Sequence, residues 1–254
     1  MQQMQRHIFL VFKNQYLRLN FFMRNKYYFL LALLLLNTMA CFNKQEKPTS
    51  YQIATQEEIN KEDKHNLNDV IADFESKERL AWQKPEFIIN LFGDISSKVV
   101  ADLGAGTGFF SFRLVRTAKK VIALDIDKRF LSFMDSLKVE LPKDLQDRFE
   151  TREVSENDAH LKAHEVDAVL VVNTYMYIGN RIEYLKRLKQ GISKGGSIII
   201  VDYKDKNLPV GPPSEIKIPL HTVENELKSA GYKVVSADDN TLEYQYIVKA
   251  IVND

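Results

Sequence analysis

The chain has 254 residues, of which 45% are hydrophobic and 27% are charged, and its formal net charge is +1. These values are ordinary for a soluble globular protein, and the balanced charge gives no reason to expect a nucleic acid partner. The single cysteine excludes an internal disulfide framework and a zinc site built from several thiolates. The charge is unevenly spread, because residues 1–40 contain five basic residues and no acidic one.

The single cysteine, Cys41, follows a short basic segment that starts at Met23, an apolar run, and small residues that end with Ala40. The apolar run is shorter than the roughly 20 residues that span a membrane, and it suits a signal peptide. The pattern resembles a bacterial lipoprotein signal with Cys41 as the lipidated residue, although Thr38 stands where an aliphatic residue is typical. An uncleaved anchor, or an incidental cysteine on a cytoplasmic protein, is the alternative.

The composition predicts three parts. Residues 1–41 form the signal or anchor segment, and Met23 is the expected start of translation because residues 1–22 would make the basic region unusually long. Residues 42–65 are polar and read as a tether, and residues 66–254 form the folded domain. We therefore expect a membrane-anchored lipoprotein of the bacterial cell envelope, with a cytoplasmic location as the alternative.

The folded domain opens with two predicted helices. Apolar residues recur with helical spacing over 67–74. A second helix is predicted after Pro85, because proline suits the first helical turn, and it should bury Phe87, Ile88 and Leu91.

Beyond these helices, apolar strands alternate with helical segments, and this alternation predicts a parallel sheet with helices on both faces. Two apolar runs near the end flank a turn at 238–240 and predict an antiparallel hairpin. The fold class is therefore α/β, a doubly wound sheet of seven strands. Strands are expected at 98–103, 121–125, 148–154, 166–173, 195–203, 232–237 and 241–252, and helices at 109–116, 130–137, 181–190 and 221–230.

The first strand runs into the stretch VADLGAGTGFF, in which Asp102 precedes Gly104, Gly106 and Gly108. Glycines in this turn allow positive φ angles and a close approach of a ligand to the backbone. The dinucleotide fingerprint G-x-G-x-x-G would place its third glycine where this chain has Phe109, and the Gly-Lys-Ser/Thr ending of a phosphate loop is absent. The spacing therefore favours neither phosphate ligand.

VADLGAGTGFF resembles motif I, Asp/Glu-x-Gly-x-Gly-x-Gly, of class I S-adenosylmethionine-dependent methyltransferases, and the likeness covers roughly residues 67–252. The resemblance implies a Rossmann-like, mostly parallel seven-stranded sheet with a C-terminal antiparallel hairpin. It also implies that S-adenosylmethionine is the cofactor, with Asp102 and Gly104 to Gly108 around its methionine and ribose portions. We call residues 104–110 the glycine loop.

Further cofactor contacts are expected at the ends of the next strands. Asp125 lies 21 residues after Gly104 and can accept hydrogen bonds from both ribose hydroxyls, with Asp127 as the alternative. The resemblance places Asp158 near the adenine edge and Asn173 on the methyl-transfer side. The expected cofactor-binding residues are Asp102, Gly104, Ala105, Gly106, Gly108, Asp125, Asp158 and Asn173.

Three other segments are similar to a bacterial subset of this family: ERLAWQKP at 78–85, NTYMYI at 173–178 and DYKDKNLPVGPP at 202–213. The first matches an R-x-x-W-Q-x-P element, although Trp82 fits a core aromatic equally well. Members often carry a His-His pair where this chain has Met176 and Tyr177, so we expect no metal.

Because the sulfonium is already an activated donor, methyl transfer mainly requires placement of the acceptor. A base is needed only if the acceptor must lose a proton. The residues expected near the crevice mouth are Tyr175, Tyr177, Asp202, Tyr203 and His221, of which the three tyrosines are the catalytic candidates. No basic aromatic surface stands out, so we expect a small-molecule acceptor and no nucleic acid. The alternatives are an envelope lipoprotein with this fold but without catalysis, and another nucleotide-binding enzyme.

Overall fold

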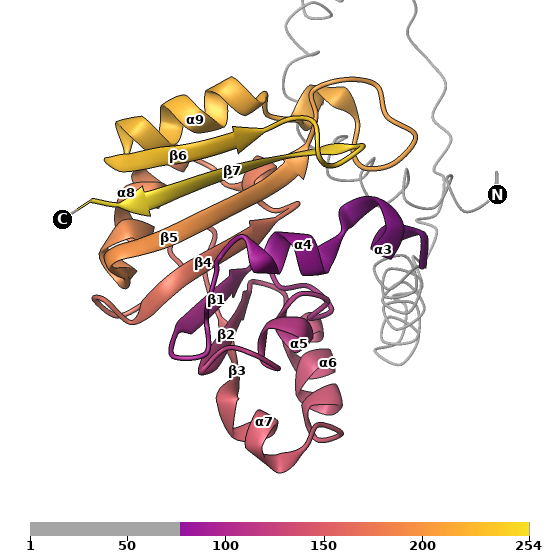
Figure 1. Cartoon of the computed structure of the whole chain (residues 1–254), viewed down its shortest axis with the longest axis vertical. Coiled ribbons are helices and arrows are strands. Elements are labelled where there is room, and N and C mark those ends of the chain that lie inside the picture. The colour runs from indigo at the N-terminus through magenta and orange to yellow at the C-terminus, as the bar shows by residue number, and fades with distance from the viewer. Residues whose placement is uncertain (1–76, 254) are drawn as a thin grey trace, which may run out of the picture. The chain divides into compact units, whose positions relative to one another are not determined.

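Seven strands form one sheet in the order β3-β2-β1-β4-β5-β7-β6 (Figure 1). The structure is a computed structural model and describes residues 77–253. The predicted signal segment, the tether at 42–65 and the helix over 67–74 lie outside the described residues.

The sheet confirms the predicted topology. The first five strands pair in parallel, and β7 is inserted antiparallel between β5 and β6. The Val- and Ile-rich central strands are covered on both faces, as parallel strands usually are. The strands are β1 (Val99–Leu103), β2 (Lys120–Asp125), β3 (Phe149–Glu153), β4 (Val166–Val172), β5 (Ile192–Tyr203), β6 (Tyr232–Asp238) and β7 (Gln245–Val252).

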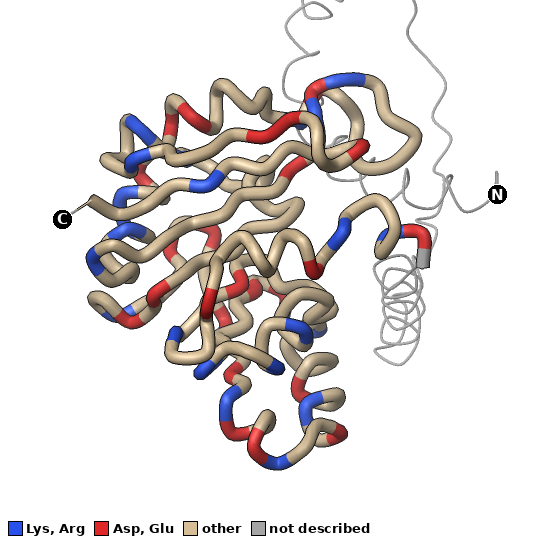
Figure 2. Tube along the Cα trace, in the orientation of Figure 1, with Lys and Arg blue, Asp and Glu red and all other residues tan. Residues whose placement is uncertain are grey.

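Helices cover the sheet on both faces and give it two hydrophobic cores. One core includes side chains of α8 and α9, and the other includes side chains of α4, α5 and α6. Charged residues lie mainly on helices, loops and strand ends (Figure 2). The helices are α3 (Lys77–Gln83), α4 (Pro85–Asn90), α5 (Ser111–Leu114), α6 (Lys128–Lys138), α7 (Lys143–Arg148), α8 (Arg181–Gly191) and α9 (Leu220–Ser229), with short 3-10 turns η2 (Tyr175–Tyr177) and η3 (Ser214–Ile216).

The predicted inward face of α4 was right for Ile88 and wrong for Phe87, and Leu91 packs only partly against the core. The helix buries Ile88 and Ile89, whereas Phe87 is 38% exposed and Leu91 is only half-buried. Successive residues of a helix are rotated by about 100°, so two adjacent isoleucines that face the sheet turn the preceding Phe87 outward.

Two further helices differ from the expectation. The helix predicted at 109–116 is regular only over Ser111–Leu114, because the glycine turn extends as far as Phe110. Helix α7 was not predicted.

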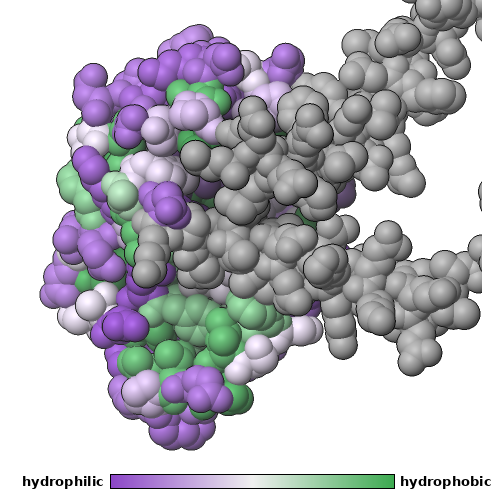
Figure 3. All heavy atoms as spheres, turned by 90° about the vertical axis from the view of Figure 1, so that its right-hand side faces the viewer, coloured by the Kyte–Doolittle hydropathy of each residue, from purple (hydrophilic) through white to green (hydrophobic). Residues whose placement is uncertain are grey.

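Helix α6 buries Met134 but leaves Leu137 exposed. Figure 3 views the side of the molecule that carries α6 and shows apolar surface there.

The turn after β1 depends on glycine at position 104. Gly104 has a φ of +75°, and a Cβ atom at this position would lie 2.2 Å from Oγ1 of Thr174. Thr174 follows β4, the strand that pairs with β1, so the glycine lets the two strand ends approach closely.

We predict that Gly104→Ala destabilises the domain more than Gly93→Ala. Both glycines have positive φ, which costs a residue with a Cβ about 1–2 kcal/mol, but no atom lies within 4 Å of a Cβ at Gly93. The clash with Thr174 should add about 1–3 kcal/mol at Gly104. Urea denaturation of both variants measures the difference, and equal losses would contradict the steric role of Thr174.

Candidate functional site

Asp102, Asp125, Asn173 and Tyr203, four of the predicted site residues, lie at the carboxyl edge of the sheet. Asp102 pairs in register with Leu170 of β4, and Asp125 is the last residue of β2. Asn173 follows β4, and Tyr203 ends β5. Ligands of doubly wound sheets bind outside this edge, where the strand order reverses. The reversal here lies between β1 and β4.

The glycine loop is fastened to the end of β2 by backbone hydrogen bonds. The amides of Gly104 and Ala105 both donate to the carbonyl of Leu124, at 2.8 and 3.0 Å. The amide of Gly106 donates to Oδ2 of Asp125 at 2.8 Å. These three hydrogen bonds therefore hold the glycine loop against the end of β2.

Asp125 is 8% exposed, and its other oxygen, Oδ1, accepts from the amide of Asp127 at 2.9 Å. Burial raises the pKa of its carboxyl, and the hydrogen bonds from Asp127 and Gly106 oppose this rise. Each carboxylate oxygen has more than one lone pair, so both keep capacity to accept from a ligand. Asp127, the alternative, caps α6 through the amide of Arg129 and pairs with its guanidinium.

Asp102 is 2% exposed and accepts a hydrogen bond of 2.6 Å from the hydroxyl of Ser111. Burial raises the pKa of this carboxyl to about 6, against the lowering effect of Ser111, and the nearby charge of Asp125 adds to the rise. Two buried carboxylates thus stand beside the glycine loop.

Asn173 adopts a left-handed conformation with a φ of 56°, which asparagine tolerates better than most residues. The backbone amide of Asn173 donates to the carbonyl of Val201 at 2.9 Å, and this hydrogen bond joins the end of β4 to β5. Its side-chain Oδ1 accepts from Nε2 of Gln245, and Nδ2 lies 3.5 Å from the Tyr203 hydroxyl.

Asp158 is half-buried in the loop after β3, where the sequence places it. Its Oδ1 accepts from the amide of His160 at 2.8 Å, and its backbone pairs with Ser155. The carboxylate therefore holds its own loop in shape.

The three candidate tyrosines have different surroundings. Tyr175 is 1% exposed and donates to Glu226 at 2.6 Å, and Glu226 pairs with Arg181 between α8 and α9. The Tyr175 hydroxyl is thus hydrogen-bonded to the Glu226–Arg181 ion pair and is not exposed at the carboxyl edge of the sheet. Tyr177 is exposed on the turn after β4. Tyr203 is buried, and burial raises its pKa to about 12, so it stays protonated at neutral pH.

A buried carboxyl adjoins these tyrosines. Asp202 is 1% exposed and accepts only backbone hydrogen bonds among the described contacts, from Met176 at 3.2 Å and from its own neighbour Tyr203 at 2.9 Å. Burial raises the pKa of Asp202 to about 7. A group that titrates near neutrality is suited to exchange a proton with a ligand.

Two buried polar residues, Gln83 and Gln245, were given no role by the sequence prediction. Both are fully buried, and they bond to each other at 3.1 Å. The only signal for Gln245 was a polar residue within the apolar run of the last strand.

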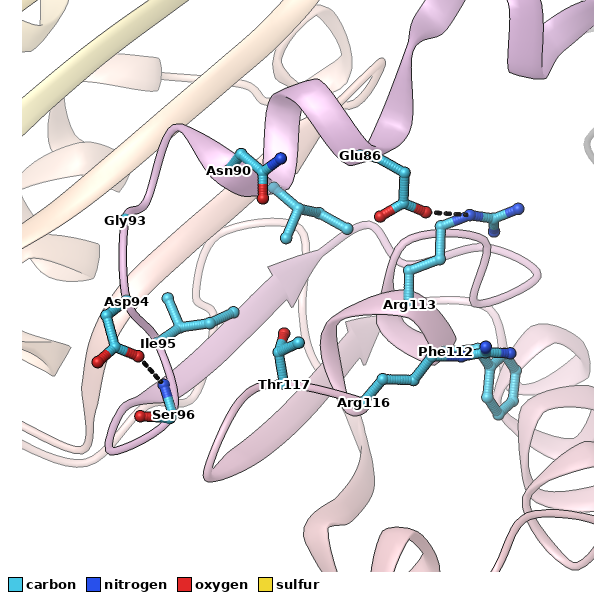
Figure 4. Close-up of a pocket in the computed structure, with 11 residues that line it drawn as sticks. Glu86, Asn90, Gly93, Asp94, Ile95, Ser96, Phe112, Arg113, Arg116 and Thr117 are labelled. Carbon is cyan, nitrogen blue, oxygen red and sulfur yellow. Dashed lines mark hydrogen bonds and ion pairs between the residues drawn. The ribbon is translucent and has the colours of Figure 1, made fainter.

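A pocket of about 680 Å³ lies elsewhere, between α4, α5 and the turn before β1 (Figure 4). The ion pair of Glu86 with Arg113 (3.8 Å) and the hydrogen bond of Ser96 to Asp94 (2.9 Å) lie on its wall. None of the predicted site residues lines it. Its lining includes the turn just before β1, so it adjoins the amino end of that strand, opposite the glycine loop.

No three His, Cys, Asp or Glu residues among the described residues 77–253 gather as a metal site would require. None of the helices in this part of the chain is both long enough and apolar enough to cross a membrane.

Residues 95–250 match the methyltransferase domain family, and the chain belongs to this family. No curated protein matches the sequence. Among solved structures, the chain is similar to a SAM-dependent methyltransferase from Aquifex aeolicus, with 24% identity over 72% of this chain and 96% of that chain and a TM-score of 0.66.

Two further structures share the fold. A putative type 11 methyltransferase from Sulfolobus solfataricus has 20% identity over 67% of this chain and 92% of that chain, with a TM-score of 0.55. The [4+2]-cyclase SpnF has 11% identity over 70% and 84%, with a TM-score of 0.60. These similarities confirm the Rossmann-like methyltransferase fold expected from the sequence, and the description of several matches as SAM-dependent agrees with the expected cofactor.

We predict that, without ligand, Asp102→Asn gains stability relative to the parent protein as the pH rises through about 6. The carboxyl has a pKa of about 6 when folded and an ordinary value of 3.8, so its contribution becomes less favourable as the pH rises from about 4 to above 6. Two pKa units correspond to about 3 kcal/mol. The free energy of unfolding of the variant, relative to the parent, should therefore rise by about that amount between pH 4 and pH 8. A pH-independent difference in urea unfolding would contradict the burial of this charge.

Proposed function

We propose that the protein transfers the methyl group of S-adenosylmethionine to a small-molecule acceptor. Membership of the methyltransferase domain family supports the reaction class. The observation that carries the cofactor assignment is the pair of buried carboxylates, Asp102 and Asp125, beside the glycine loop.

The donor chemistry of S-adenosylmethionine fits this pair. Carboxylates only accept hydrogen bonds when ionised, and the cofactor offers them an ammonium group and two ribose hydroxyls as donors. A pyrophosphate placed at the same loop would bring like charges together, which is costly at a buried site. This contrast favours the sulfonium nucleoside over a dinucleotide.

The residues of the edge then have distinct tasks. Asp125 accepts from the ribose hydroxyls, Asp102 and the glycine loop hold the methionine end, and Asp158 lies toward the adenine. The bound cofactor supplies an activated methyl group. Asn173 lines the methyl-transfer side, where the acceptor must be held in line with the departing sulfur.

Proton removal is a secondary requirement at this site. Tyr203 stays protonated at neutral pH and cannot serve as a base there. The buried Asp202, with its pKa raised by burial to about 7, matches better the pKa that a base for such an acceptor needs. An acceptor that already presents a lone pair needs no base.

A different chemistry on the same fold is the second candidate. One solved structure with this fold is described as a [4+2]-cyclase, which shows that the fold itself does not fix the reaction. The buried carboxylate pair argues for a bound cofactor in either case.

We also propose that the protein is a lipoprotein of the bacterial cell envelope, attached through Cys41. The support is the basic, apolar and small-residue pattern that ends at this cysteine. A polar tether over 42–65 would separate the domain from the membrane surface.

Titration calorimetry with S-adenosylmethionine and its demethylated product tests the cofactor assignment. We expect Asp125→Ala to weaken binding about tenfold or more, because hydrogen bonds to charged groups are worth about 1.5–3 kcal/mol. Asp147→Ala is the matched control, because this carboxylate lies on α7 in an exposed pair with Lys143. No binding by the parent protein, or binding of NADH in its place, would reject the proposal.

Mass spectrometry of protein from its native host tests the anchor. We expect a diacylglycerol-modified Cys41 at the new N-terminus and loss of the lipid in Cys41→Ser. A peptide from residues 1–22 in the mature protein would contradict both the cleavage and the start at Met23.

A further inference from the structure

Two fully buried glutamine side chains lie between the start of the described chain and the proposed site. Gln83 ends α3 and Gln245 begins β7, and 162 positions separate them in the sequence. Burial of an amide costs free energy unless all its polar atoms are paired. Each polar atom of these two side chains therefore needs a hydrogen-bond partner.

The two glutamines belong to a single chain of hydrogen bonds that runs from Arg79 to Asn173. Nε of Arg79 donates to Oε1 of Gln83 at 2.6 Å. Nε2 of Gln83 donates to Oε1 of Gln245 at 3.1 Å, and Nε2 of Gln245 donates to Oδ1 of Asn173. Every buried amide end has a partner.

Arg79 fixes the direction of this chain. A guanidinium can donate but cannot accept, so Gln83 must present its oxygen to Arg79. The NH2 group of Gln83 then faces Gln245 and donates to its side-chain oxygen. The NH2 group of Gln245 is therefore turned toward Asn173. The position of Arg79 is itself fixed, because its guanidinium lies 4.2 Å from the ring centre of Phe109 in the glycine loop.

The chain ends at the amide of Asn173. Because Oδ1 is occupied by Gln245, the NH2 group points toward Tyr203, whose hydroxyl lies 3.5 Å away. This last contact is longer than an ordinary hydrogen bond, so the Asn173 NH2 group keeps capacity to donate to a bound molecule. Asn173 is half-exposed, whereas both glutamines are buried.

We propose that Arg79, Gln83 and Gln245 are positioning residues that form a one-directional hydrogen-bond relay and fix Asn173 with its NH2 group toward the methyl acceptor. The relay selects acceptors that offer an oxygen or nitrogen lone pair at this point. The inference rests on the proposed methyl transfer for the identity of the ligand, whereas the relay itself is a property of the protein alone.

The substitution Gln83→Glu reverses the relay without removing a hydrogen bond. Both oxygens of the carboxylate accept, one from Arg79 and the other from Gln245, so the amide of Gln245 must turn over. Asn173 then donates to Gln245 and presents its oxygen to the Tyr203 hydroxyl, which becomes a donor.

Nuclear magnetic resonance of the full-length protein detects this reversal. We expect the side-chain amide signals of Asn173 to move in Gln83→Glu, although the hydrogen bonds of residue 83 go to Arg79 and Gln245. We also expect the Cζ signal of Tyr203, identified with Tyr203→Phe, to move as its hydroxyl becomes a donor. Gln146→Glu is the matched control on α7, where the amide donates to the Val139 and Leu141 carbonyls, and it should move neither signal.

A second variant protects the test against misfolding. Arg79→Met acts on a half-exposed side chain and removes the group that sets the direction, so the Asn173 amide should show two sets of signals. Unchanged Asn173 signals in either folded variant would overturn the relay. Binding of S-adenosylhomocysteine is measured in parallel, so a failure of the proposed function and a failure of the relay remain distinguishable.

Discussion

The hydrogen bond from the Gly106 amide to the buried Asp125 carboxylate joins the glycine loop to the second strand. The loop turns back after β1 through Gly104, which has a positive φ and lies so close to Thr174 that a Cβ atom would clash there. The polar edge of the sheet is therefore assembled by backbone geometry as much as by side chains. A buried carboxylate without such donors would cost the folded protein several kcal/mol of stability.

Most of the fold could be predicted from periodicity, because the Val- and Ile-rich strands and their spacing leave few alternatives to a doubly wound sheet. Asp102, the glycines and Asp125 could be placed at one edge because the carboxyl ends of parallel strands meet there. The surroundings of Tyr175 could not be predicted. Its commitment to Glu226 depends on the packing of α9 against α8, which no local pattern encodes.

The R-x-x-W-Q-x-P element now has a physical explanation. Arg79 covers Phe109, Gln83 enters the relay, and Pro85 begins α4. Trp82 is half-buried and lies 6.1 Å from the ring of Tyr203 and 5.8 Å from that of Tyr244. It is thus a packing aromatic that also adjoins the site. The element fastens the start of the domain to its glycine loop and its last strand.

The antiparallel insertion of β7 has a consequence for synthesis of the protein. Because β7 runs opposite to β5, its first residue, Gln245, lies beside Tyr203, the last residue of β5. A parallel strand would have delivered its final residue there instead. A chain made from its N-terminus can form the glycine loop early, but it cannot complete the hydrogen-bond chain from Arg79 to Asn173 until β7 has left the ribosome.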